Sequence, residues 1–175
     1  MTLDLFSIPL ASLKRTEGAK KDFRLTGAMD GVLSVGLTTL PAGREILIVG
    51  SLESAGDGVL VTATLSLDLD LTCGRCLIQF SQMTKIDLQE LFVYPEKHQA
   101  YEDEDVSYID NETIDLSDSI RDAIILDQVL SPVCRPDCLG LCPECGSDLN
   151  SDPDHGHGPG VDSRWLTLSE WGKIA

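Results

Sequence analysis

The cysteines constrain this chain more than any other feature, because all six lie in two short clusters far apart along the sequence. The first cluster is Cys73-Gly74-Arg75-Cys76, and the second is followed by His155-Gly156-His157. The second cluster contains Cys134, Cys138, Cys142 and Cys145. Two residues between paired cysteines allow one tight turn to direct both sulfurs at one ion, a spacing typical of structural zinc. The pattern therefore predicts a fold in which bound metal holds part of the chain in place.

Six cysteines could instead form disulfides in a small secreted domain. However, Met1–Leu13 has no basic segment ahead of its apolar residues, and Asp4, Ser7 and Pro9 interrupt the apolar run. This start is not typical of a signal peptide, and no stretch approaches the length of a membrane span. We therefore expect a cytoplasmic protein without membrane contact. In such proteins, C-x-x-C pairs more often bind metal or carry redox chemistry than form disulfides.

Composition limits the choice of partners. The chain has 175 residues with 42% hydrophobic content, enough to bury one core, so a single domain is the default. Its formal net charge is −16, from 29 acidic and 13 basic residues. Such a surface repels a phosphate backbone and favours basic protein partners, although high charge can also serve solubility alone.

The charge is unevenly distributed. An acidic run occupies Glu102–Asp105, and five basic residues gather near the N-terminus. Three interpretations of this basic stretch remain open: it contacts RNA, it pairs with the acidic run, or it is a solvated flexible loop. The five basic residues are Lys14, Arg15, Lys20, Lys21 and Arg24.

The middle of the sequence alternates between apolar and polar residues. Every odd position from Val59 to Cys73 is apolar or cysteine, and the apolar positions resume on even numbers from Ile78 to Phe92. A period of two predicts strands with one buried face. The first cysteine pair then lies at a hairpin tip, where Gly74 supplies a permissive φ angle. A strand at Glu45–Glu53 completes an antiparallel meander, and weaker strands are expected near 3–13 and 31–37.

The remaining segments complete an α+β class prediction. Residues 95–112 are polar and acidic and predict a loop. An apolar stripe predicts one main helix over about 116–130, started by Asp115 or Ser117 and ended before Pro132. A short C-terminal helix would carry Trp165 and Trp171. The predicted fold is an antiparallel β-meander or small barrel-like sheet with one main helix and a C-terminal zinc-knuckle tail, divided into a β-rich core (1–131) and a metal-binding tail (132–175) packed on the same domain.

Eight side chains are candidate ligands for one or two structural Zn²⁺ ions. The turn Cys142-Pro143-Glu144-Cys145-Gly146 directs two thiolates and several backbone N–H groups at one point. We favour one ion on Cys142, Cys145, His155 and His157. The second ion would bind Cys73, Cys76, Cys134 and Cys138. A single four-cysteine site, in the tail alone or from the two C-x-x-C pairs, remains an alternative.

These motifs resemble the YceD family of large ribosomal RNA subunit accumulation proteins. The resemblance is carried by Cys73-Gly74-Arg75-Cys76-Leu77, by the helix that begins at Asp115-Leu116, by the run C-R-P-D-C-L-G-L-C-P-E-C-G over 134–146, and by Asp162-Ser163-Arg164-Trp165-Leu166. It covers roughly residues 47–168. Two positions depart from the family pattern: many relatives have C-x-C in place of His155-Gly156-His157, and proline in place of Ser163. The resemblance implies a role in 23S rRNA accumulation or processing and no known catalytic activity.

Three functional hypotheses follow. The first is a non-enzymatic ribosome-biogenesis factor that binds a large-subunit ribosomal protein or pre-ribosomal particle, or RNA through Lys14–Arg24. The second is a regulator whose cysteine pairs alternate between zinc-bound and disulfide forms. The third, a zinc hydrolase, requires an open metal position and a general base, and no residue spacing singles either out. We therefore predict no catalytic residues.

Overall fold

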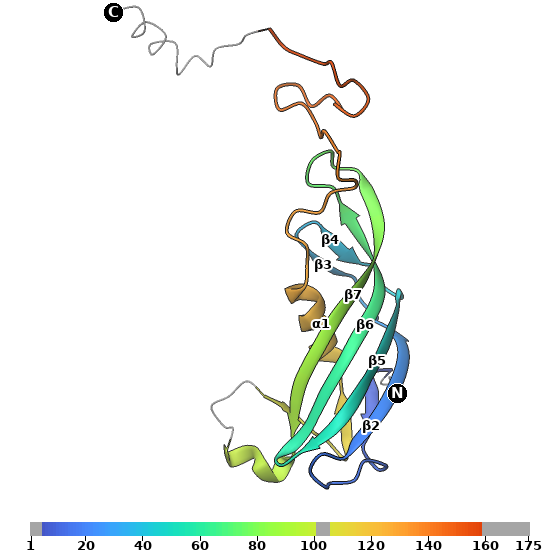
Figure 1. Cartoon of the computed structure of the whole chain (residues 1–175), viewed down its shortest axis with the longest axis vertical. Helices are drawn as coiled ribbons and strands as arrows, with labels where there is room; N and C mark the ends of the chain where they lie inside the picture. The colour runs from blue at the N-terminus through green and yellow to red at the C-terminus, as the bar shows by residue number, and fades with distance from the viewer. Residues whose placement is uncertain (1–4, 101–105, 159–175) are drawn as a thin grey trace, which may run out of the picture.

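The computed structural model describes residues 5–100 and 106–158, which form a mostly antiparallel sheet with one α-helix. Figure 1 shows an elongated molecule in which the cysteine-rich segments lie at one end and the short 3-10 helix η1 at the other. Its elements are β1 (Ser7–Pro9), β2 (Lys20–Ala28), β3 (Leu33–Val35), β4 (Thr38–Leu40), β5 (Glu45–Ala55), β6 (Gly58–Thr72), β7 (Gln79–Val93), η1 (Pro95–Ala100), β8 (Ser107–Tyr108), β9 (Thr113–Asp115) and α1 (Ser117–Leu126).

The predicted meander is confirmed as β5, β6 and β7, which pair antiparallel in sequence order. β6 is the central strand: β5 pairs with its residues 58–67, and β4 pairs with Leu71 and Asp70 near its end. β2 pairs with β5 along its whole length. Since β2 has no pairing with β7 among the described residues, the sheet remains an open, curled layer and not a closed small barrel.

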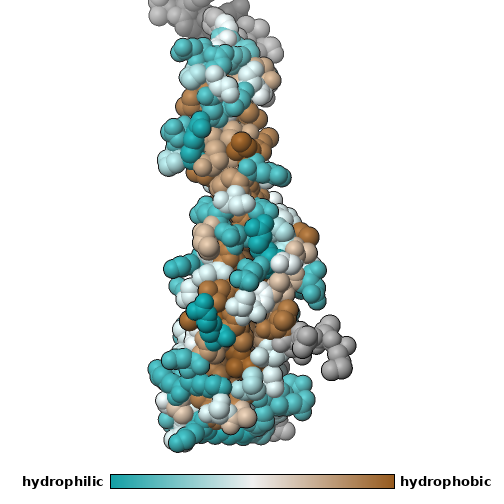
Figure 2. All heavy atoms as spheres, turned by 90° about the vertical axis from the view of Figure 1, so that its right-hand side faces the viewer, coloured by the Kyte–Doolittle hydropathy of each residue, from teal (hydrophilic) through white to brown (hydrophobic). Residues whose placement is uncertain are grey.

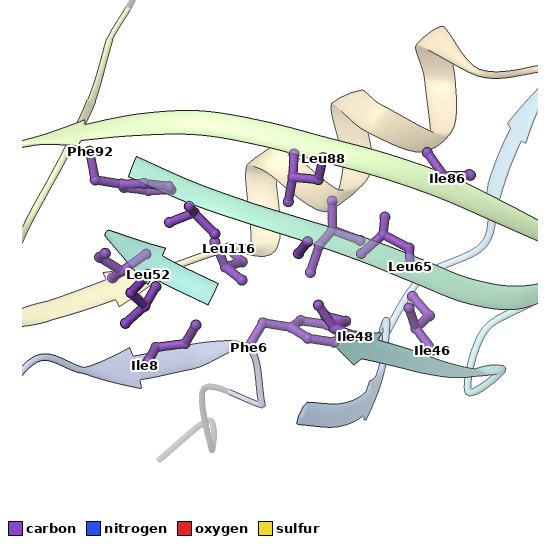
Figure 3. Close-up of a cluster of buried hydrophobic side chains, with 14 of the residues drawn as sticks. Phe6, Ile8, Ile46, Ile48, Leu52, Leu65, Ile86, Leu88, Phe92 and Leu116 are labelled. Carbon is purple, nitrogen blue, oxygen red and sulfur yellow. The ribbon is translucent and has the colours of Figure 1, made fainter. Parts of the chain in front are cut away.

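One face of the sheet carries the core. Even positions of β5 and odd positions of β6 are buried, as the period-two pattern predicts. Figure 3 shows Ile48 and Leu65 from these strands near Phe6 and Leu116, which come from the segments that cover this face. Burial of each such side chain contributes roughly 1.5–3 kcal/mol. The helix adds Ile120 and Ile124 to the same core.

The opposite face of the sheet is polar and open. Alternate residues of β6, including Thr62, Thr64 and Ser66, point away from the core. Figure 2 shows the long molecule from the side, with hydrophilic residues over most of this view and hydrophobic patches between them. The core is therefore one-sided, built between the sheet and the elements that cover its inner face.

The main helix is shorter than its apolar pattern predicts. It ends at Leu126, where the Asp127 N–H donates to the Ala123 carbonyl, and not near Ser131. Leu126 and Leu130 are 84% and 86% exposed, so the last part of the predicted stripe packs on nothing. The reason is tertiary: the chain must leave the helix to reach the hairpin tip, where the Pro132 carbonyl accepts the Gly74 N–H. At the start of the helix, the Asp115 carboxylate accepts the Ser117 N–H at 2.9 Å.

Several weaker predictions need correction. Residues 20–28 form strand β2, which was not predicted, and the part of the basic stretch from Lys20 to Arg24 is therefore not a flexible loop. The strand forms because alternate residues such as Phe23 and Leu25 pack on the core. The expected loop at 95–112 contains η1 and the short strand β8. The strand expected near 3–13 is limited to Ser7–Pro9. The acidic run 102–105 and the C-terminal helix lie outside the described residues.

Candidate metal centres

The hairpin between β6 and β7 positions the first cysteine pair. The Cys73 N–H donates to the Ile78 carbonyl, and the Leu77 N–H donates back to the Cys73 carbonyl, which closes a tight turn. Leu77 adopts a φ of 60°, whereas Gly74 does not have the positive φ that we predicted for it. Glycine at position 74 serves close packing instead, since a Cβ there would lie 3.1 Å from the Ser131 hydroxyl.

The segment after α1 brings two more cysteines to this tip. The Gly74 N–H donates to the Pro132 carbonyl at 2.8 Å, which fixes the chain two residues before Cys134. The Arg75 guanidinium donates to the Cys138 carbonyl at 2.9 Å, and the Arg75 carbonyl accepts the Leu141 N–H at 3.1 Å. The turn and the returning segment are therefore held together by hydrogen bonds in addition to any metal.

Four sulfurs converge here in what we call the hairpin-tip cluster: Cys73, Cys76, Cys134 and Cys138. The Cys73 and Cys138 sulfurs are 3.9 Å apart, and those of Cys76 and Cys134 are 3.7 Å apart. All four lie within 4.8 Å of one another. Tetrahedral zinc with Zn–S bonds of about 2.3 Å holds its sulfurs about 3.8 Å apart. The spacing therefore fits a zinc ion, and all six cysteines of the chain are free thiols.

The surroundings of the hairpin-tip cluster shift the pKa values of its thiols in opposite directions. Backbone N–H groups, first that of Cys76, lower the pKa of Cys73 to about 6. Desolvation, followed by hydrogen bonds with the neighbouring thiols, raises the pKa of Cys134 to about 12. The protein alone thus stabilises only part of the negative charge that four thiolates would carry. A dication at the centre would supply the rest.

A neighbour that the spacing did not predict completes this cluster. The side-chain amide of Asn150 lies 3.7 Å from the Cys138 sulfur, and its oxygen accepts the Leu139 N–H at 2.9 Å. Such outer hydrogen bonds orient ligands and tune their basicity. Asn150 belongs to no recognisable ligand pattern, so only the folded chain reveals it.

The second pair is positioned by a compact turn. The Gly146 N–H donates to the Cys142 carbonyl, and the Cys142 N–H donates to the Ser147 carbonyl, both at 2.8 Å. Gly146 adopts a φ of 75°, a left-handed conformation that favours glycine. The C-P-x-C-G motif therefore folds locally, as its sequence predicts.

The two histidines close over this turn to form what we call the tail cluster: Cys142, Cys145, His155 and His157. The His157 Nε2 lies 3.2 Å from the Cys142 sulfur, the His155 Nε2 lies 3.1 Å from the Cys145 sulfur, and the two Nε2 atoms are 3.0 Å apart. A tetrahedral zinc ion would separate such atoms by about 3.3–3.6 Å, slightly more than observed. The four donors thus surround one point at nearly the required distances.

Carboxylates contact the other nitrogen of each histidine ring. The His157 Nδ1 lies 3.4 Å from Glu144, and the His155 Nδ1 lies 3.8 Å from Asp152. A carboxylate at one ring nitrogen orients the other toward a metal. Near Cys145, the Ser147 hydroxyl is the main cause that lowers the pKa of that thiol to about 6. Glu144 is therefore placed to orient the His157 ring.

The structure thus brings together the two sets of four residues that the favoured partition names, and each set could hold one metal ion. If all four residues of a set bind one ion, they would fill a tetrahedral site, as in structural zinc, and would leave no position for a reacting water molecule. That these eight residues bind metal stays a prediction, as does the division into a core (1–131) and a tail (132–175).

The basic stretch is dispersed by the fold. Arg15 forms ion pairs with Glu96 and Glu112, and its guanidinium lies 4.4 Å from the centre of the Tyr94 ring. Lys20 pairs with Glu53 at 3.0 Å. Internal pairing therefore occurs, with Glu53, Glu96 and Glu112, whereas the acidic run 102–105 lies outside the described residues. At least two of the five basic side chains are engaged within the molecule.

An open, mostly antiparallel sheet with one α-helix in the described residues, and two Cys/His clusters that could each hold a metal ion, make this an α+β protein. The chain belongs to the YceD family: the family model described as "Large ribosomal RNA subunit accumulation protein YceD" matches residues 61–170. The matched region contains all eight candidate ligands.

Individual relatives agree with this assignment. An uncharacterized protein of Mycobacterium tuberculosis is 37% identical over 166 residues, which cover 94% of this chain and 80% of the relative. A chloroplastic protein of Zea mays, named as a YCED homolog for large ribosomal RNA subunit accumulation, is 53% identical over 38 residues, 22% of this chain and 13% of the relative. An uncharacterized Bacillus subtilis protein is 26% identical over 108 residues, 61% of this chain and 62% of the relative.

No solved structure matches. Among the described residues, no helix has both the length and the apolar character needed to cross a bilayer.

Proposed function

We propose that this protein is a non-enzymatic, cytoplasmic factor in large-subunit ribosome biogenesis that supports 23S rRNA accumulation. The observation that carries the proposal is the family match over residues 61–170, in a family described by large ribosomal RNA subunit accumulation. The match includes most of β6, all of β7 and α1, and both clusters, so it covers the parts of the chain that hold the candidate sites.

Two structural zinc ions would shape the end of the molecule that carries both clusters. The hairpin-tip cluster would attach the segment after α1 to the β6–β7 tip, and the tail cluster would order the following loop, as a zinc knuckle does. Their chemistry supports a structural role, since thiolate and imidazole donors fill four positions. No turnover at either ion is part of the proposal.

The partner that the chain's chemistry favours is a basic ribosomal protein or a pre-ribosomal particle that presents one. A net charge of −16 attracts such a partner and repels exposed phosphate. Contact with RNA through Lys14, Arg15, Lys20, Lys21 and Arg24 is a weaker candidate, because Arg15 and Lys20 already pair with acidic side chains.

The test is deletion of the gene followed by complementation. Cells without the protein should contain less 23S relative to 16S rRNA, and the wild-type chain should restore the ratio. Affinity-tagged protein should recover large-subunit precursors or a large-subunit protein from lysate. An unchanged ratio together with no such recovery would remove the proposal.

A second candidate, a thiol-based regulator, is favoured by the exposure of Cys145 beside the buried Cys142. Peroxide would take two electrons from this thiol pair, form a disulfide, release two protons as water and free the metal. A metallochromic indicator would detect the released zinc. Unchanged zinc content under mild peroxide would argue against this function.

A further inference from the structure

A groove runs between the free edge of β7 and the side of α1. Its volume is about 350 Å³. Figure 1 shows α1 alongside β7, and Figure 3 shows Ile86 and Leu88 of this strand next to the helix. One wall is the strand from Ile86 to Glu90. The other wall is formed by Ser119, Asp122, Ala123, Leu126 and Asp127.

The β7 edge along this groove has no strand partner among the described residues. β6 pairs with β7 from Gln79 to Val93 on one side. On the other side, β8 pairs only with Phe92 and Val93. Backbone N–H and C=O groups of an unpaired strand edge are a template for an added strand. The edge from Gln79 to Leu91 is therefore long enough to receive an extended peptide beside the helix.

The groove is strongly acidic, and its charge is not balanced within the described part of the chain. Glu90 lines it from the strand and Asp122 and Asp127 line it from the helix, whereas the Asp87 side chain lies on the other face of the sheet, beside Thr64. Asp87 accepts a hydrogen bond from Thr64, and Glu90 accepts one from Ser107. None of the three groove carboxylates forms an ion pair with a described basic residue. Like charges gathered along one groove disfavour one another, so a cationic occupant would relieve this repulsion.

An apolar contact accompanies the charge. Leu126 lies in the groove wall and is 84% exposed, although it is a large hydrophobic residue on the only α-helix of the described chain. Residues of an added strand point alternately to its two sides, so every second side chain would face α1, where the aliphatic stem of a lysine or arginine can rest on Leu126 while its charged end reaches a carboxylate. An occupant that alternates basic and apolar residues fits both features.

We propose that the groove between β7 and α1 binds an extended segment of a basic partner protein as an added β-strand, with lysine or arginine side chains facing Glu90, Asp122 and Asp127. This inference deepens the proposed function, on which it rests for the identity of the partner. Strand addition supplies affinity through the backbone and specificity through alternate side chains. A second copy of this chain is disfavoured as the occupant, because its own β7 would bring the same carboxylates into the groove.

The probe is a fluorescent peptide of about twelve residues that alternates lysine and valine, matched to the length of the free edge. Anisotropy with the full-length protein should show binding that weakens as salt is added. The double variant Asp122→Lys/Asp127→Lys should bind at least about tenfold more weakly, as expected for removal of close charge pairs. The control Asp22→Lys/Glu45→Lys changes the net charge equally at the opposite side of the sheet and should retain affinity.

Two further measurements separate strand addition from unspecific attraction. Hydrogen exchange should slow at β7 amides between Gln79 and Leu91 when the peptide binds. A peptide with the same side chains but alternate N-methylated amides should bind weakly and give no protection. A peptide that alternates glutamate and valine should bind the Asp122→Lys/Asp127→Lys variant better than the wild type, which also shows that the variant folds.

Equal loss of binding in both double variants, or binding without β7 protection, overturns the inference. So does sedimentation that shows a dimer whose β7 amides are protected without peptide. Pull-downs separate this inference from the proposed function. If both the wild type and the groove variant recover large-subunit precursors, the groove inference is wrong but the proposed function stands. If neither recovers them, the proposed function is wrong.

Discussion

The hairpin-tip cluster and the tail cluster use similar donors in equal number but differ in where those donors come from. The hairpin-tip cluster joins a turn at Cys73–Cys76 to a segment at Cys134–Cys138, whereas the tail cluster is built entirely within residues 142–157. Cys73 and Cys138 are buried, and Cys145 is exposed. A link between distant segments restricts the unfolded chain more than a short loop does. Similar coordination chemistry can therefore support the whole fold at one site and only local order at the other.

The largest effect should follow from breaking the hairpin-tip cluster. In Cys73→Ser, the zinc content should fall from two ions to one, because the ion in the hairpin-tip cluster loses one of its four thiolate ligands. Cys73 is fully buried. The melting temperature should fall by roughly 10 °C or more, since metal binding contributes directly to folding and the returning segment loses its attachment. Metal analysis and calorimetry of purified protein measure both quantities. Retention of two ions would show that Cys73 is not a ligand.

In metal-free protein, the reaction rates of individual thiols should also distinguish the tail cluster from the hairpin-tip cluster. The pKa of Cys145 is lowered to about 6, so this group is mainly thiolate at pH 7. The pKa of Cys134 is raised to about 12, so that group remains protonated at the same pH. Iodoacetamide should modify Cys145 at least about a hundredfold faster, because only the thiolate reacts. Mass spectrometry of peptides over time measures the ratio. Similar rates at pH 7 would contradict the assignment.

Substitution of a glycine next to the hairpin tip should reduce the stability of the protein by an intermediate amount. Gly140 adopts a φ of 82°, and an added Cβ would lie 3.0 Å from the Arg75 carbonyl. Gly140→Ala should therefore destabilise the protein by about 2 kcal/mol, through both backbone strain and crowding. The matched control is Gly146→Ala in the tail turn, which has a φ of 75° but no atom within 4 Å of the added Cβ. Urea unfolding should show a loss of only about 1 kcal/mol for the control.

The smallest effect on the sheet should come from the tail cluster. Cys145→Ser should also remove one zinc ion, yet lower the melting temperature of the core by less than about 3 °C, because its ligands all lie within one short loop. Hydrogen exchange should become faster between residues 142 and 157 and remain unchanged in β6. A melting temperature that falls as far as in Cys73→Ser would remove the distinction between the two clusters.

Local patterns predicted those parts of the fold that depend on neighbouring residues. The alternation from Val59 to Phe92 predicted β6, β7 and their turn, because period two and a short connection determine a hairpin. The C-P-x-C-G turn was equally local. Strand β2 was missed because charged residues interrupt the apolar alternation around Phe23 and Leu25. Its strand conformation depends on pairing with β5, which the local pattern does not reveal. The end of α1 was misplaced for a similar reason, since its apolar stripe continues beyond Leu126.

The sequence by itself determined the kinds of donor, their spacing within each turn and the family to which the chain belongs. Only the tertiary structure decided which distant donors meet, because β6, β7 and α1 must pack before Cys134 can approach Cys76. The same packing placed Asn150 beside Cys138 and left the β7 edge open next to three carboxylates. Turns are encoded by residues in contact along the chain, whereas a site between segments depends on the length and direction of every element that connects them.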